Sequence, residues 1–406
     1  MKIPPPELLL QVSNDASGES YRKVRHVRNS IEQQLIAAGR RFADFERILD
    51  FGCGVGRLLQ ALNEIRRPGQ SLFGCDVNGE CAKWCRENLD FAAVEHTALQ
   101  PPLPYPDAFF DLITAISVFT HLSRPLQVTW ARELLRVVKP GGAILLTTCG
   151  VGFLPEVLAN HERWKSRHFA MLGSSGMLYS FAEDESSAFE GQREVFVLHS
   201  RDAIANLFAP LDLAWHAPVT AVGGGQDVSV LAKPEQDCRV VQPGPAGGVS
   251  AAVSAEIPPS GQDSTVATFH FELGGAASAR FRSYVAFSER RHDLTHLTVD
   301  AAIRDAGSGQ LLAERRFAFP NSVALGPDHL FPFSLDCPPA PSVDVLLGIS
   351  TRRDPWQPAA IRLAWWDPRI EVGAAPLAGT GARSDGFVAG PAMELVAVEE
   401  RPIAVL

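Results

Sequence analysis

The sequence has no long apolar run and no excess of basic residues. No stretch reaches the roughly 18 apolar residues that a membrane-spanning helix needs, and the N-terminus lacks the continuous apolar core of a signal peptide. Lysine and arginine number 37 against 46 aspartates and glutamates, which gives a net charge of −9. We therefore expect a soluble cytoplasmic protein with neither a membrane nor a nucleic acid as its main partner.

Cysteines are few and irregularly spaced. The chain has seven of them, and an odd number without regular spacing argues against a disulfide framework. Cys75, Cys81 and Cys85 lie close together, but no second Cys/His pair follows at the spacing of a zinc site. The sequence therefore predicts no bound metal.

The chain is long enough for two or more domains, with 406 residues of which 46% are hydrophobic. The amino-acid composition changes near residue 235, where a stretch rich in proline, glycine, alanine and serine begins. We expect an α/β domain over 1–235 with an insertion or lid at about 150–194, a linker over 236–262, a β-sandwich over 263–372 and a flexible tail over 373–406 with a possible last strand.

Strands and helices alternate through the first half. Apolar strands are expected at 47–51, 71–76, 91–95, 110–116 and 143–148, and helices at 20–42, 57–65, 80–88 and 126–138. Two further strands at 211–216 and 227–232, with no helix between them, predict an antiparallel pair at one edge. The pattern predicts a Rossmann-like, doubly wound sheet of seven strands, mostly parallel with an antiparallel edge.

Seven short extended segments between residues 265 and 366 are separated by turn residues, and no strong helical pattern interrupts them. This is typical of an antiparallel sandwich. Residues 1–15, which contain three consecutive prolines, are expected to form a flexible or loosely docked lead.

One stretch, R-I-L-D-F-G-C-G-V-G-R-L-L over 47–59, carries most of the chemistry. A strand leads through alternating glycines into a helix, which brings bare backbone close to a ligand, and the exposed N–H groups at the helix start then face that ligand. The spacing is Gly-x-Gly-x-Gly rather than the Gly-x-Gly-x-x-Gly of a dinucleotide site. Asp50 stands before the first glycine, where a carboxylate would repel a pyrophosphate but could pair with an ammonium group.

Four motifs occur together, in order and at consistent spacing. They are the glycine loop after Asp50, Asp76 at the end of the second strand, the proline-rich lead L-Q-P-P-L-P-Y-P-D-A-F-F-D over 99–111, and L-L-R-V-V-K-P-G-G over 134–142. On these motifs the N-terminal 235 residues resemble a class I S-adenosylmethionine-dependent methyltransferase. The segment G-G-G-Q-D-V-S-V-L over 223–231 is similar to the last strand pair of the bacterial type 11/12-like subgroup.

The resemblance implies S-adenosyl-L-methionine as cofactor and S-adenosyl-L-homocysteine as product. Asp50 would meet the ammonium group, and Asp76 would accept hydrogen bonds from both ribose hydroxyls. Asp76 alone would serve an NAD ribose equally well. The predicted cofactor-binding residues are Asp50, Gly52, Cys53, Gly54, Gly56, Asp76, Val77, Thr97, Ala98, Leu99 and Ser117.

An oxygen or nitrogen acceptor would need a base to take its proton. His121 follows the fourth strand at the edge where ligands bind, so it is the first candidate; it could instead cap a helix or pack against the loop. His199 is the second candidate. His161 and His168, in the insertion, read as lid or surface residues. Tyr21 fits either a contact to the cofactor carboxylate or helix packing.

The predicted function is methyl transfer to an oxygen or nitrogen of a glycan or a small natural-product molecule. The alternative is a non-catalytic or NAD-binding protein of the same fold. The second half matches no catalytic motif, and Trp356, Trp365 and Trp366 suit either a sugar-stacking surface or a core. Sugar binding, dimerisation and bracing of the lid remain open for the sandwich, with a homodimer as one expected assembly.

Overall fold

A computed structural model of the chain describes residues 1–13, 17–153, 177–180, 196–220, 222, 225–235, 239–241, 252–257, 264–274, 276, 278–287, 294–319, 331–353 and 361–373. The chain divides into two compact units, and the second begins in the main at Gln236. Most of the predicted insertion, including His161 and His168, and nearly all of the predicted tail lie outside the described residues, as does Trp356.

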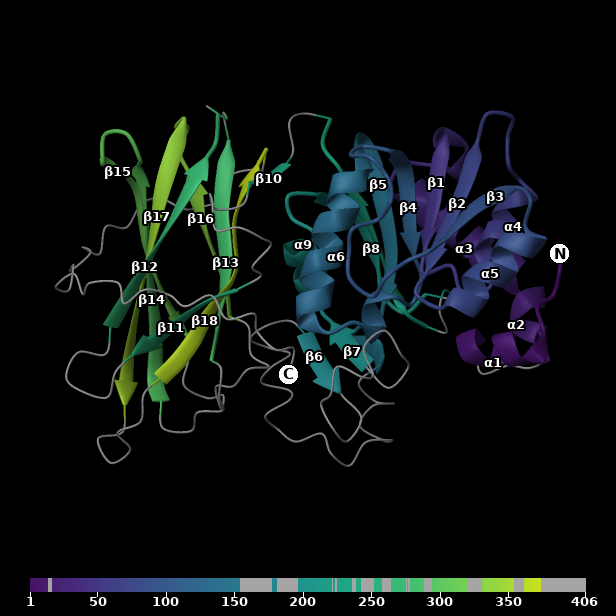
Figure 1. Cartoon of the computed structure of the whole chain (residues 1–406), viewed down its shortest axis with the longest axis horizontal. Coiled ribbons are helices and arrows are strands. Elements are labelled where there is room, and N and C mark those ends of the chain that lie inside the picture. The colour runs from purple at the N-terminus through teal and green to yellow at the C-terminus, as the bar shows by residue number, and fades with distance from the viewer. Residues whose placement is uncertain are drawn as a thin grey trace. The chain divides into compact units, whose positions relative to one another are not determined.

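The first unit is built on a seven-stranded sheet in the order β3-β2-β1-β4-β5-β9-β8 (Figure 1). Its strands are β1 (Arg47–Phe51), β2 (Ser71–Asp76), β3 (Ala92–His96), β4 (Phe110–Ala115), β5 (Val138–Thr148), β8 (Asp212–Ala217) and β9 (Asp227–Ala232). The first five are parallel, whereas β9 runs antiparallel to both of its neighbours. The predicted doubly wound sheet with an antiparallel edge is confirmed.

Helices cover both faces of this sheet. They are α1 (Pro6–Ser13), α2 (Glu19–Arg22), α3 (Val24–Ala37), α4 (Arg57–Asn63), α5 (Gly79–Asn88), α6 (Arg124–Val137) and α9 (Arg201–Leu207), with short 3-10 turns η1 (Phe42–Asp44), η2 (Phe119–His121) and η3 (Val151–Phe153). The helices α3, α4 and α5 share one core with the sheet. On the opposite face, Trp130 of α6 packs on Phe51 with ring centroids 4.8 Å apart.

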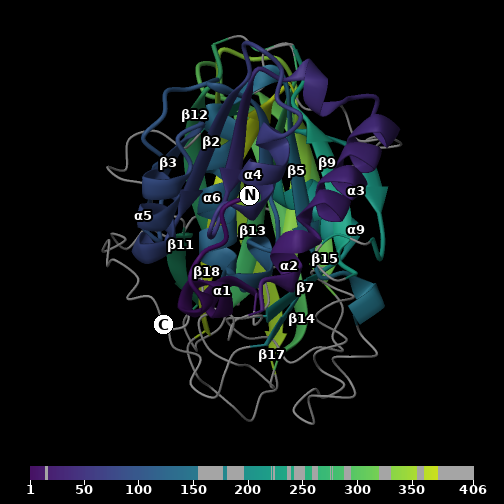
Figure 2. The same cartoon turned by 90° about the vertical axis from the view of Figure 1, so that its right-hand side faces the viewer.

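The N-terminal lead is ordered, unlike our expectation. It forms α1, which lies with α2 at one end of the sheet (Figures 1 and 2). Leu9 of α1 is 1% exposed and joins a small core with Tyr21 and Val55. The prolines do not oppose this helix because Pro6 occupies its first position, where the missing N–H is not needed.

The second unit is a sandwich, as predicted. One sheet contains β10 (Arg239–Val241), β11 (Ala252–Ile257), β13 (Ala279–Phe287), β16 (Phe331–Cys337) and β18 (Ile361–Val372). The other contains β12 (Ser264–Glu272), β14 (Leu294–Asp305), β15 (Leu311–Phe319) and β17 (Ser342–Arg353). Inward-facing residues of both sheets, such as Phe271, Phe281 and Val345, form one core.

Two strand assignments differ from the expectation. The segment expected to be a linker includes β10 and β11, which both pair with β18, because each strand finds a partner far along the chain. A separate pair, β6 (Met177–Ser180) and β7 (Phe196–His199), lies outside the main sheet. No described helix is long and apolar enough to cross a membrane, and no three described His, Cys, Asp or Glu side chains are grouped to hold a metal ion.

Gly56 is the residue that lets the loop after β1 enter α4. It has a φ of 68°, and a Cβ there would collide with Leu89 Cδ1 and approach Cys85 Sγ at 3.1 Å. We expect Gly56→Ala to lower the free energy of unfolding by more than about 2 kcal/mol, since left-handed strain and overpacking add.

Gly39→Ala is the matched control. Gly39 also has a positive φ, of 78°, but nothing lies within 4 Å of its Cβ position. The free energy of unfolding of Gly39→Ala should fall only by the cost of left-handed backbone strain, about 1 kcal/mol. Equal losses in the two variants, measured by denaturant titration, would show that the contact with Leu89 does not matter.

Candidate functional site

The loop between β1 and α4 is fastened to the end of β2 by its own amides. The N–H groups of Gly52 and Cys53 both donate to the Cys75 carbonyl, at 2.9 and 3.0 Å, and Gly54 N–H donates to Asp76 Oδ2 at 2.7 Å. These three amides are therefore hydrogen-bonded inside the protein, and they form no open cradle for a phosphate.

Asp76 ends β2 and organises the turn that follows. Its second oxygen, Oδ1, accepts the Asn78 N–H at 2.8 Å. Asn78 in turn caps α5, with its side-chain oxygen accepting from the amides of Glu80 and Cys81. Burial raises the pKa of Asp76, while the amides of Asn78 and Gly54 oppose that rise. The carboxylate is held in one orientation at the edge of the sheet.

Asp50 is buried under the loop, with 3% of its surface exposed. Thr114 of β4 donates its hydroxyl to Asp50 Oδ1 at 2.9 Å. Burial raises the pKa of Asp50 to about 7, a rise that the Thr114 bond opposes and the nearby Asp76 adds to. Two carboxylates thus flank the glycine loop, and the buried one is ready to change its charge near neutral pH.

The segment after β3 is held by α6. Thr97 is 8% exposed and its N–H donates to the Asp76 carbonyl at 3.0 Å. Trp130 Nε1 donates to the Leu99 carbonyl at 2.9 Å. Ala98 between them is exposed, and Val77 beside Asp76 is 44% exposed although it is apolar. These residues line the same edge as Asp76.

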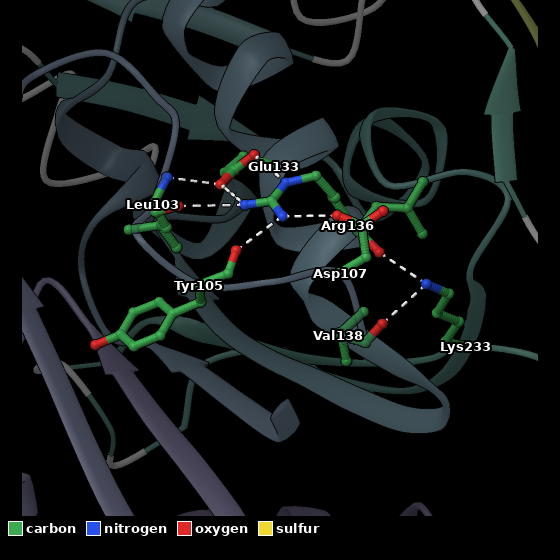
Figure 3. Close-up of polar contacts among 8 residues, drawn as sticks. Leu103, Tyr105, Asp107, Glu133, Arg136, Val138 and Lys233 are labelled. Atoms are coloured by element: carbon green, nitrogen blue, oxygen red, sulfur yellow. Dashed lines mark hydrogen bonds and ion pairs between the residues drawn. The ribbon is translucent and has the colours of Figure 1, made fainter. Parts of the chain in front are cut away.

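The proline-rich loop is anchored through Arg136 of α6 (Figure 3). The guanidinium donates to the carbonyls of Leu103 and Tyr105 and forms ion pairs with Glu133 at 2.6 Å and Asp107 at 2.7 Å. Glu133 also accepts the Leu103 N–H at 2.6 Å. This network fixes the loop that follows Leu99.

Lys233 binds the C-terminal end of α6. Its Nζ donates to the carbonyls of Leu135 and Val138, each at 2.8 Å, so a buried cation sits at the C-terminal end of α6 (Figure 3). The helix that carries Trp130 and Arg136 is therefore fixed at its end.

A second polar cluster lies where β4 and β5 end. Ser117 N–H donates to Thr147 Oγ1 at 2.8 Å, and the Ser117 hydroxyl donates to Gln226 Oε1 at 2.9 Å. Thr147 Oγ1 donates to the same Gln226 oxygen at 2.5 Å. The next residue, Val118, lies against Gly52, so the cluster borders the glycine loop.

The two candidate bases differ in their surroundings. His121 ends η2 and is half-buried. His199 is 1% exposed, its Nε2 lies 3.0 Å from Gln127 Oε1, and Gln127 Nε2 donates to the carbonyls of Phe119 and Leu122. His199 therefore supports η2 from the interior, whereas His121 lies on η2 itself.

The N-terminal helices pack against the loop. Tyr21 is 1% exposed and donates its hydroxyl to the Val55 carbonyl at 2.6 Å, which is the packing role. Val12 of α1 lies 3.1 Å from the Cβ position of Gly54. Gln11 Oε1 accepts from the Asn78 side chain at 2.8 Å. The lead thus borders the same edge as Asp76.

Sequence reasoning missed several residues of this site. Asn78 could have been found, because an Asn just before an expected helix is a common N-cap. The hydrogen bonds of Thr114, Trp130, Thr147 and Gln226 have no local signal, since each joins the residue to a partner more than 30 residues away.

Asp50 generates a stability prediction. Because its pKa is raised from 3.8 to about 7, the folded state binds a proton that the unfolded state has lost between these values. Stability is therefore lost as pH rises toward 7. Asp50→Asn keeps a partner for Thr114 and removes this cost, so it should stabilise the ligand-free protein by up to roughly 4 kcal/mol at pH 8.

The same variant should differ much less from wild type at pH 4, where the aspartate is protonated in the folded state and still about half protonated in the unfolded state. Thermal midpoints of both proteins between pH 4 and 8 test this. A stability difference that stays constant over this range would contradict a titrating Asp50.

Comparison with known proteins agrees with this geometry. Residues 49–146 match the family described as "Methyltransferase domain". The tRNA N(3)-cytidine methyltransferase METTL2 of Gallus gallus is 28% identical over 150 residues, which is 34% of this chain and 40% of that protein. The 27-O-demethylrifamycin SV methyltransferase of Amycolatopsis mediterranei is 31% identical over 104 residues, 25% of this chain and 38% of that protein.

Among solved structures, an S-adenosylmethionine-dependent methyltransferase from Clostridium acetobutylicum aligns over 53% of this chain and 97% of its own, with 15% identity and a TM-score of 0.37. The chain spans 40% and 38% of the length of the two curated relatives named above, and the residues 49–146 that match the family include Asp50 and Asp76. The N-terminal unit therefore contains, over residues 49–146, the methyltransferase domain that the sequence motifs predicted.

Proposed function

We propose that the protein transfers a methyl group from S-adenosylmethionine to an oxygen or nitrogen of a glycan or small-molecule acceptor. One observation carries the choice of cofactor. The loop amides of Gly52, Cys53 and Gly54 already donate hydrogen bonds to the last residues of β2, while the carboxyl groups of Asp50 and Asp76 flank the loop. Such a site suits an ammonium group and a diol, and it opposes the pyrophosphate of NAD.

The residues present fit this cofactor. Each oxygen of Asp76 accepts one amide, at 2.7 and 2.8 Å, and a carboxylate has about four acceptor positions, so two remain for ribose hydroxyls. Val77 and Ala98 give the exposed, uncharged surface that an adenine ring needs. Asp50 lies below the loop and would pair with the ammonium group of the cofactor. The positive charge of that group favours the ionised form of Asp50.

When bound, the cofactor supplies a methyl group on a sulfonium, and the sulfur keeps the electron pair of the broken bond as the methyl forms its new bond to the acceptor. The protein must place the acceptor in line and take its proton. We assign the proton to His121, because it lies half-buried on η2 at the carboxyl edge of the sheet. The burial of His199 and its bond to Gln127 suit a support for that turn instead.

We infer the class of acceptor from the net charge of the chain and from the substrates named for its relatives. A net charge of −9 opposes a polyanionic acceptor, which supports a glycan or small molecule. The METTL2 relative, by its name, acts on tRNA, and this favours tRNA as a second candidate. The rifamycin relative acts on a natural product. We place acceptor recognition outside the matched residues 49–146, with the sandwich as an accessory binding or dimerisation unit.

Cofactor binding tests the proposal directly. Asp76→Ala removes the ribose acceptor, and we expect the dissociation constant for S-adenosylmethionine to rise at least about tenfold in calorimetry, because hydrogen bonds to a charged group are lost. Gly54→Val should also abolish binding, since its φ of 53° and the nearby Val12 leave no room.

Asp90→Ala, a change at an exposed aspartate of the same unit, is the control and should bind as wild type does. Wild type should show no binding of NAD. Unchanged affinity in Asp76→Ala, or preference for NAD, would remove the methyltransferase proposal.

The base assignment is tested by transfer of a labelled methyl group. With glycan, small-molecule and tRNA fractions offered separately, we expect label in one of the first two. His121→Ala should reduce the rate by about 10²–10⁴-fold while cofactor affinity stays unchanged. His26→Ala, an exposed histidine of α3, serves as control.

Label found only in tRNA would favour the second candidate and reject the first. Full activity of His121→Ala on the labelled fraction would show that the acceptor loses its proton without this histidine.

A further inference from the structure

The cluster of Ser117, Thr147 and Gln226 is not explained by folding alone. Ser117 has a φ of 59°, a conformation that costs a non-glycine residue energy and persists only where its surroundings hold it. Val219, on the hairpin between β8 and β9, has a φ of 51°. Strained residues of this kind gather at functional sites. Both lie at the edge where β4, β5 and the hairpin meet.

The hydrogen bonds fix the direction of each proton in the cluster. Thr147 Oγ1 accepts the Ser117 N–H, so its own proton goes to Gln226 Oε1. That oxygen also accepts the Ser117 hydroxyl proton, while Gln226 Nε2 points to Cys149 Sγ at 3.7 Å. The amide orientation is thereby set. The Ser117 hydroxyl therefore uses its proton in the hydrogen bond to Gln226, and the lone pairs of its oxygen remain available as acceptors.

Ser117 also has the right place relative to the glycine loop. It follows β4, whose Thr114 is bonded to Asp50, and it precedes Val118, whose side chain lies against Gly52. Its backbone carbonyl is held by the Thr120 hydroxyl at 3.0 Å. Ser117 is half-buried, so part of its surface is exposed.

We infer that the Ser117 hydroxyl oxygen faces the sulfonium group of the bound cofactor, and that Gln226 is a positioning residue that keeps the hydroxyl proton turned away. The inference rests on the proposed function. A sulfonium is positively charged and polarises the C–H bonds of its methyl group, so lone pairs of a neutral oxygen attract it. The product, S-adenosylhomocysteine, is a neutral thioether and lacks this attraction.

The test compares the affinities of the full-length chain for S-adenosylmethionine and S-adenosylhomocysteine by calorimetry. Ser117→Ala should weaken binding of the methionine form by about two- to five-fold and leave the homocysteine form within a factor of about two. Gln226→Leu should do the same, because the freed hydroxyl can turn its proton toward the cation. Gln226→Glu retains the accepting oxygen and should restore the preference of wild type.

Thr120→Val is the matched control. It removes a hydroxyl that holds the same residue by its carbonyl, so any effect should fall on both ligands equally. If Ser117→Ala and Gln226→Leu weaken both ligands equally, or neither, the cluster is structural and the inference fails. If wild type binds neither ligand, the proposed function itself fails, which is a distinct result.

Discussion

The fastening of the first loop to the second strand is the constraint from which the rest of the site follows. The Cys75 carbonyl takes two amides of the loop, and Asp76 takes a third. Glycines with positive φ allow the chain to turn back far enough to make these bonds. The result is an edge at which the amides of Gly52, Cys53 and Gly54 are already hydrogen-bonded within the protein. Carboxylates and exposed apolar surface lie beside these amides.

That constraint explains the electrostatics of the edge. Two carboxyl groups lie close to one another, and the pKa of each is raised by burial. Burial makes the charge on Asp50 costly, and the nearby Asp76 adds to the cost. A ligand that carries a cation lowers this cost, whereas a phosphate raises it. The charge of this edge therefore supports the cationic cofactor that we propose.

The sequence was sufficient for those parts of the protein that depend on local pattern. The strand that ends at Asp76, the glycine loop and the seven-stranded sheet were all predicted, because periodicity and turn residues specify them. The strands β10 and β11 were missed, since alanine, serine and glycine around them read as a linker and only pairing with β18 makes them strands.

The same reasoning explains why single residues of the site were predicted and the bonds between them were not. Asp50 and Asp76 lie at fixed offsets from glycines, so their roles follow from order along the chain. Ser117 was predicted to contact the cofactor and Gln226 lies in the predicted last strand pair, but the two are 109 residues apart, so no local pattern links them. Their relation exists only because β9 returns antiparallel beside β5 and brings its first residues to the carboxyl edge. The antiparallel edge of the sheet therefore has a function that a purely parallel sheet would not supply. It brings a distant glutamine next to the end of β4, where it holds the proton of a strained serine.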